Sequence, residues 1–117
     1  MSKPLAFEIS HHEEDGLHVL HFSGRLDAIT SPTAESQIIK VIEKGDTFIV
    51  NLRDLFYISS AGLRLILVFV KRTKKKSARM IFCAPGEHIL KAFEVSNFLE
   101  FLEIAENIEE AVLKLRT

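Results

Sequence analysis

Two adjacent serine hydroxyls lie where a strand-like segment passes into an apolar helix. The segment from Phe56 to Arg64 reads FYISSAGLR. Beyond Ala61, apolar residues recur at the i, i+3, i+4, i+7 spacing of a helix, which predicts Ser59 or Ser60 as its N-cap. A helix N-terminus presents unpaired N–H groups and a partial positive charge, and both favour an attached phosphate. The pattern therefore predicts either a plain helix cap or a site of serine phosphorylation.

The helix that follows, predicted from Ser60 to about Arg72, is apolar on more than one side. Its predicted core face carries Leu63, Ile66, Leu67 and Val70. At 100° per residue, the other side carries Leu65, Val68 and Phe69. This second face is either covered by neighbouring helices or offered to a protein partner, and Arg64 at its edge could pair with an acidic partner residue. Gly62 either lets a partner backbone approach closely or is merely tolerated in the first helical turn.

Strands and helices alternate along the rest of the chain. The predicted strands are Leu5–Ser10 and Leu17–Ser23, which form a hairpin, followed by Phe48–Leu52, Ala78–Cys83 and Leu102–Ile104. A helix is predicted to open at Ser31-Pro32 and to close at Gly45, and further helices are predicted over Glu87–Glu94 and Ile108–Leu115. This order predicts an α/β fold, with a mixed four- to five-stranded sheet, an N-terminal β-hairpin and about four helices packed on the sheet.

The size and composition of the chain fit one globular domain. At 117 residues, roughly two-thirds of the unfolded surface can be buried. Hydrophobic residues make up 47% and charged residues 26%, which argues against disorder. The longest apolar stretch after Arg64 is Leu65–Val70, far below the ~20 residues that span a bilayer. Because Met1–Pro4 lacks a signal-peptide core, we expect a cytoplasmic protein without membrane insertion.

Other residues that could carry chemistry have structural explanations. The single cysteine, Cys83, lies in an apolar run and is predicted to be a buried small hydrophobe. The basic run over residues 71–76 follows a helix C-terminus, where cations complement the dipole, so no nucleic-acid site is predicted. None of the histidines has the spacing of a zinc site, and no metal is predicted. These histidines are His11, His12, His18, His21 and His88.

Four segments resemble, in order, the STAS domain, the family of bacterial anti-sigma-factor antagonists. The run from Phe56 to Arg64 resembles the family's phosphorylation loop. Gly24–Asp27 resembles the turn after its second strand, and Phe93–Leu99 resembles its late helix and following loop. Asn107–Ala111 resembles the start of its last helix. The resemblance covers about the whole chain and implies a single STAS domain over residues 1–117.

The resemblance also implies the site of modification. Aligned on Gly62, the phosphorylated serine of the family falls at Ser60, its preceding aspartate at Ser59 and its second hydroxyl at Ala61. Ser60 is therefore the expected phosphorylation site, with Ser59 as the alternative. The loss of the aspartate removes an acidic neighbour of the acceptor hydroxyl. In the family, the turn that carries Asp27 lies beside the phosphoserine loop, although Asp27 could equally serve only its own turn.

As the resemblance implies, the unphosphorylated protein would bind an anti-sigma factor and release the sigma factor. That partner is usually a serine kinase that uses ATP and magnesium, and a serine phosphatase would reverse the modification. The protein would be the substrate in this cycle, so it needs no cofactor of its own, and we expect a monomer when it is free. The expected partner-binding residues are Asp27, Ser59, Ser60, Ala61, Gly62, Arg64, Leu65, Val68 and Phe69.

Two other classes of protein could use the same residues. A STAS-type docking subunit of a transporter or a larger signalling assembly would use the same helix face permanently, with Ser60 as a cap only. A small hydrolase would use Ser60 as its nucleophile, but the chain contains no Gly-x-Ser-x-Gly elbow and is short for a triad scaffold. We therefore expect a regulator rather than an enzyme.

Overall fold

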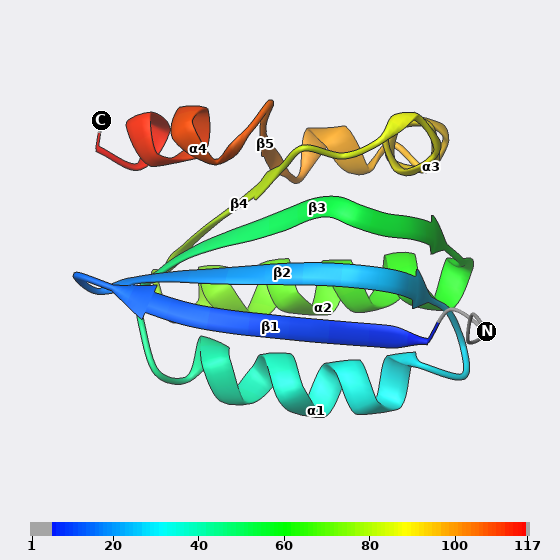
Figure 1. The fold of residues 1–117 in the computed structure, drawn as a ribbon, viewed down its shortest axis with the longest axis horizontal. Helices are drawn as coiled ribbons and strands as arrows, with labels where there is room; N and C mark the ends of the chain where they lie inside the picture. The colour runs from blue at the N-terminus through cyan, green and yellow to red at the C-terminus, as the bar shows by residue number, and fades with distance from the viewer. Residues whose placement is uncertain (1–5, 117) are drawn as a thin grey trace, which may run out of the picture.

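A β-sheet with the strand order β1-β2-β3-β4-β5 forms the centre of the computed structural model, which describes residues 6–116 (Figure 1). The strands are β1 (Phe7–Glu14), β2 (Leu17–Leu26), β3 (Thr47–Ile58), β4 (Arg79–Cys83) and β5 (Glu103–Ala105). The helices are α1 (Ser31–Ile42), α2 (Ser60–Lys75), α3 (Glu87–Val95) and α4 (Ile108–Leu115), with a 3₁₀ turn η1 (Phe98–Glu100). The predicted α/β fold, with its hairpin, mixed sheet and packed helices, is confirmed.

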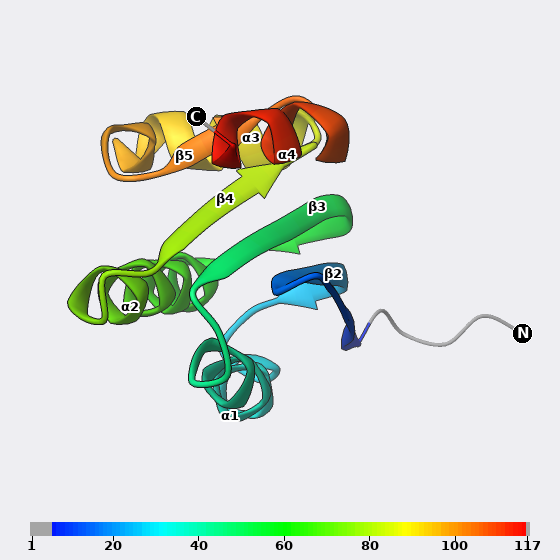
Figure 2. The same cartoon turned by 90° about the vertical axis from the view of Figure 1, so that its left-hand side faces the viewer.

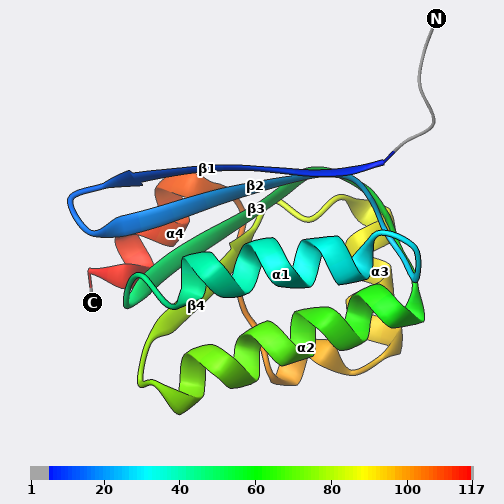
Figure 3. The same ribbon diagram turned by 90° about the horizontal axis from the view of Figure 1, so that it is seen from below.

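The strands pair antiparallel in the opening hairpin and parallel elsewhere. Helices α1 and α2 lie side by side against one face of the sheet, as Figures 2 and 3 show. Ala111 of α4 packs on the opposite face, against Ile49 and Ile81. Strand β3 therefore carries a continuous apolar run, Phe48–Val50, because both of its faces are buried.

Three strands are longer than the sequence predicts, and one of them, β2, continues to Leu26. Strand β1 continues to Glu14, and the hairpin turn consists of Asp15 and Gly16 with φ of 53° and 84°. Two residues with positive φ are typical of a type I′ hairpin turn. Strand β3 continues past exposed Arg53 to Ile58, because two register shifts against β2 accommodate the extra residues. Leu5, the predicted start of the first strand, lies outside the described residues.

Gly45 does not close α1 as predicted. The helix ends at Ile42, and the backbone N–H of Glu43 caps it by donating to the carbonyl of Ile39. A Cβ atom on Gly45 would lie 2.5 Å from the ring of His18. The glycine is therefore required by close packing against a buried histidine rather than by the helix end.

The second apolar face predicted for α2 is largely covered, which agrees with the first of the two alternatives and not with a face open to a partner. Leu65 is only 4% exposed and Phe69 is fully buried in the core, while Val68 is half-buried. The buried positions follow one stripe at i, i+3, i+4 and i+7, namely Gly62, Leu65, Ile66, Phe69, Val70 and Thr73. The prediction missed the helix phase because it did not include Gly62, which turns this stripe toward the sheet.

The hairpin carries a hydrogen-bonded histidine pair. His11 Nε2 and His18 Nδ1 are 2.9 Å apart, and the two rings stack with centroids 5.1 Å apart. His18 is buried, whereas His11 lies on the exposed edge strand. Burial, followed by the neighbouring His18, lowers the pKa of His11. Lys44 and His12 lower it further, and Glu13 opposes them.

This pair predicts that acid destabilises the hairpin. The folded state holds fewer protons at His11 than the unfolded chain, so the free energy of unfolding should decrease as pH falls below ~6.5, the unfolded-state pKa. Urea unfolding at pH 7.5 and pH 5.5 measures the effect. A His11→Gln variant should show a smaller decrease than wild type, and His12→Gln serves as the matched control. An equal decrease in wild type and His11→Gln would contradict the prediction.

Candidate functional site

The two serines at the start of α2 have different structural roles. Ser59 is the N-cap, with extended backbone, and its Oγ accepts a hydrogen bond from the Gly62 N–H at 3.3 Å. Ser60 is the first residue of the helix and is exposed. Within residues 6–116, its hydroxyl makes no hydrogen bond to another group. The cap is thus Ser59, and the Ser60 hydroxyl is left free.

The turn between β3 and α2 is fixed to the end of β2. The Ser59 N–H donates to the carbonyl of Leu26 at 3.0 Å, just beyond the paired residues Leu26 and Ile58. The Ser59 carbonyl accepts the first helical hydrogen bond from the Leu63 N–H at 2.8 Å. Ser60 is therefore presented by a backbone that is bonded on both sides.

Gly62 lies at the point of closest contact between the helix and the sheet. A Cβ atom at this position would lie 2.4 Å from the Leu26 carbonyl oxygen and 2.7 Å from Cγ1 of Ile58. Gly62 is itself buried. Neither of the two roles predicted for Gly62 is found, because the backbone that it admits is that of the protein's own strand β2 and a side chain there would clash.

Asp27 organises the turn that follows Leu26. Its Oδ1 accepts hydrogen bonds from the backbone N–H groups of Ile29 and Thr30, both at 3.0 Å. Arg25 Nε lies 3.6 Å from Oδ2. The hydrogen bond from Thr30 is the main cause that lowers the pKa of Asp27. Asp27 thus holds its own turn, and this turn adjoins the serine loop through the hydrogen bond from the Ser59 N–H to the Leu26 carbonyl.

A stack of three side chains borders the same end of the sheet. The ring of Tyr57 stacks on His88 of α3, with centroids 5.6 Å apart. The guanidinium carbon of Arg25 lies 4.3 Å from the centroid of the Tyr57 ring. Sequence reasoning missed this stack, because only the pairing of Arg25 with Tyr57 across β2 and β3 brings the charge to the ring.

The electrostatic surroundings of Ser60 favour an added negative charge. The first turn of α2 contains no acidic residue, so no carboxylate offsets its positive end. Arg64 is exposed and lies one turn further along, at the i+4 position from Ser60. The start of α2 can therefore accept a phosphate on Ser60 without meeting a like charge in its own first turn.

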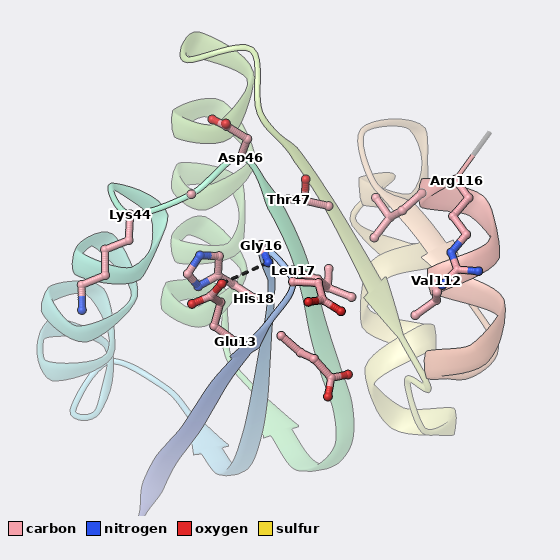
Figure 4. A pocket seen from close by; sticks show the side chains of 13 residues that line it. Glu13, Gly16, Leu17, His18, Lys44, Asp46, Thr47, Val112 and Arg116 are labelled. Carbon is pink, nitrogen blue, oxygen red and sulfur yellow. Dashed lines mark hydrogen bonds between the residues drawn. The ribbon is translucent and has the colours of Figure 1, made fainter.

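A hollow of about 720 Å³ lies at the opposite end of the sheet (Figure 4). It surrounds the β1–β2 turn and the start of β3, whereas Ser60 follows the end of β3. Acidic and basic side chains both line it, among them Glu13, Asp46, Lys44 and Arg116. This hollow is separate from the serine site.

Cys83 is buried, as predicted, and burial raises the pKa of its thiol to about 11. The negative charge of Glu109 contributes to the shift. At pH 8 this thiol should react with a disulfide reagent at least about 100-fold more slowly in the folded protein than in urea, since an ordinary thiol has a pKa of about 8.5. Absorbance of the released thiolate measures both rates, and equal rates would contradict the prediction.

Comparison with known sequences places the chain in a family. The sequence profile of the STAS domain matches residues 8–111. BtrV of Bordetella bronchiseptica, a candidate anti-sigma factor antagonist, is 29% identical over 104 residues, which cover 88% of this chain and 90% of BtrV. The anti-sigma F factor antagonist of Paenibacillus polymyxa is 26% identical over 113 residues, which cover 95% of each chain.

Solved structures share the fold. The unphosphorylated form of the anti-sigma factor antagonist SpoIIAA has a TM-score of 0.76 and 25% identity, covering 95% of this chain and 96% of SpoIIAA. The anion transporter SLC26A9 has a TM-score of 0.78 over 86% of this chain, but it is 12% identical and only 20% of its length is covered. The likeness to the transporter is one of fold alone. With a profile that covers most of its length, the chain belongs to the STAS domain family.

Proposed function

We propose that this protein is an anti-sigma-factor antagonist that is switched off by phosphorylation of Ser60. The main observation behind the proposal is that the two serines at the start of α2 differ: Ser59 caps the helix, whereas the Ser60 hydroxyl is exposed and free. Relatives named as antagonists over nearly the whole chain support the same assignment. None of the helices within residues 6–116 is long and apolar enough to cross a membrane.

The geometry favours Ser60 over Ser59 as the phosphate acceptor. The Ser59 side chain is half-buried and holds the Gly62 N–H, so its modification would remove the cap. Loss of such a cap costs about 1 kcal/mol. The Ser60 side chain does not cap the helix, so its modification leaves the cap in place. At position 59, where the family carries an aspartate before its serine, this chain has the capping Ser59. Phosphorylation of Ser60 would leave the fold intact.

The switch would act on the surface and not on the fold. A phosphate adds roughly two negative charges at a position that the helix dipole stabilises. The same charge and bulk would oppose docking of a partner against the start of α2. SpoIIAA has been solved in an unphosphorylated and a phosphorylated form, so one structural relative of this chain carries such a modification.

The surface open to a partner is smaller than the one predicted from sequence. Leu65, Phe69 and Gly62 are buried, and Ser59 is occupied as the cap. The remaining residues are Asp27, Ser60, Ala61, Arg64 and Val68. The burial of Leu65 and Phe69 narrows the docking-subunit alternative in the same way, because that alternative uses the same helix face.

The proposed cycle assigns the chemistry to other proteins. A cytoplasmic anti-sigma factor with serine kinase activity would bind the unphosphorylated form and transfer phosphate from ATP to Ser60. A serine phosphatase would restore binding. The protein itself would act as a binding partner and substrate, without a cofactor and as a monomer when free.

Reconstitution tests this function. Tagged protein is isolated from its native cells, and the co-purifying protein is identified by mass spectrometry and then produced in pure form. With ATP and Mg²⁺, that protein should phosphorylate the wild type and leave Ser60→Ala unmodified. A co-purifying protein that lacks an anti-sigma-factor sequence, or that modifies both forms equally, would overturn the proposal.

A further inference from the structure

Within residues 6–116, Ile29 is the most exposed large apolar side chain. Its exposed fraction is 87%, compared with 57% for Phe56 and 63% for Leu113. A β-branched side chain placed in water gains nothing for folding, since burial of such a group is worth about 1.5–3 kcal/mol. Because single exposed apolar side chains are common on protein surfaces, the place of Ile29 in the fold matters more than its exposure.

The turn that carries Ile29 is cross-linked by hydrogen bonds. Asp27 Oδ1 accepts from the N–H of Ile29 and of Thr30, and Thr30 Oγ1 donates to the Arg25 carbonyl at 2.8 Å. The Asp27 N–H donates to Thr30 Oγ1 at 3.0 Å, and the Ser31 N–H donates to the Asp27 carbonyl at 2.9 Å. The backbone of Ile29 is held in place before any partner arrives.

This turn lies at the same edge of the sheet as Ser60. Both segments begin where β2 and β3 end, at the paired residues Leu26 and Ile58, and the Ser59 N–H binds the Leu26 carbonyl. Figure 3 shows the β2–α1 loop and the start of α2 at one end of the molecule. A partner that docks on Ser60 thus meets a rigid turn with a projecting isoleucine beside it.

From these observations we propose that Ile29 is the principal apolar anchor of the Ser60 surface and enters an apolar recess on the anti-sigma factor. The inference rests on the proposed function and adds the residue that supplies affinity. Apolar anchors dominate interfaces when they are buried at the centre of the contact, and a pre-formed turn avoids the entropic cost of ordering. Asp27, itself on the Ser60 surface, would also position Ile29 through the turn.

Photocrosslinking in the native cells tests the anchor. Benzoylphenylalanine is placed at position 29, and in separate chains at position 64 on the Ser60 surface and at position 113 on the exposed face of α4. Position 29 should crosslink to the anti-sigma factor that co-purifies with wild type, at an apolar residue of that protein. Position 113 should not, and the crosslink from position 29 should disappear when Ser60→Glu is added.

The outcomes separate the anchor from the switch. A crosslink from position 64 without one from position 29 would show that Ile29 is not an anchor, and it would still agree with binding of the anti-sigma factor at the Ser60 surface. A crosslink from position 29 that persists with Ser60→Glu would support the anchor and count against the switch. No crosslink from either position would overturn the anchor.

Affinity measurements with the purified partner give the size of the effect. Ile29→Ala should weaken binding about 10-fold, whereas Leu113→Ala, at another exposed apolar side chain, should bind as wild type does. Asp27→Ala should also weaken binding although it keeps Ile29, because the turn loses its cross-links. Unchanged affinity of Ile29→Ala, with its thermal unfolding also unchanged, would overturn the proposal.

Discussion

A Ser60→Glu variant is expected to bind the anti-sigma factor at least about 30-fold more weakly than wild type. An unpaired charge placed in an interface costs about 2–5 kcal/mol, and each 1.4 kcal/mol is tenfold in affinity. Stability should be unchanged or slightly higher, because Ser60 makes no hydrogen bond within residues 6–116 and an acid at a helix start is favourable. Calorimetric titration with the purified partner and thermal unfolding measure the two quantities.

Two variants control for this effect. Ser36→Glu adds the same charge at an exposed serine of α1, and it should leave the affinity unchanged. Ser60→Ala should bind as wild type does, since only the hydroxyl is lost. Equal affinities for Ser60→Glu and Ser36→Glu would show that the start of α2 lies outside the interface.

Replacing Gly62 with alanine is expected to lower the free energy of unfolding by about 3 kcal/mol, at the upper end of ordinary overpacking. The new Cβ would lie 2.4 Å from the Leu26 carbonyl oxygen, a backbone atom that cannot rotate away. The same carbonyl accepts the Ser59 N–H, so any shift also disturbs the serine turn. Urea unfolding followed by circular dichroism measures the loss.

Gly86→Ala is the matched control for this substitution. Gly86 is the N-cap of α3, and a Cβ there would meet no atom within 4 Å. Its cost should stay below about 1 kcal/mol, which is the usual difference between glycine and alanine as an N-cap. If Gly62→Ala is as stable as Gly86→Ala, the claim that α2 approaches β2 too closely for a side chain at position 62 is wrong.

Local signals sufficed for most element boundaries. Helix α4 begins and ends as predicted, at Ile108 and Leu115, because Asn107 caps it by accepting from the Glu110 N–H at 2.8 Å. The start of α2 at Ser60 is also confirmed, since the capping Ser59 precedes a strongly periodic run. Caps and apolar periodicity depend on near neighbours in the chain, so the sequence reveals them.

Long-range contacts account for what sequence reasoning missed. The phase of α2 depends on Gly62 meeting Leu26, some 36 residues away. The prediction therefore assigned Leu63 and Leu67 to the core face, although both are only half-buried. The role of Gly45 depends on His18 in another strand. The register shifts that extend β3, and the stack on Tyr57, exist only once β2 and β3 have paired. No local pattern encodes such contacts.

Phosphosite mapping of the protein isolated from its native cells tests the central claim most directly. Intact mass and peptide fragmentation are compared for the wild type and for Ser60→Ala. An added mass of about 80 on Ser60, absent from the variant, is the result that the proposed switch requires. Phosphate on Ser59 with Ser60 unmodified, or no phosphate in any growth condition while a partner stays bound, would contradict it.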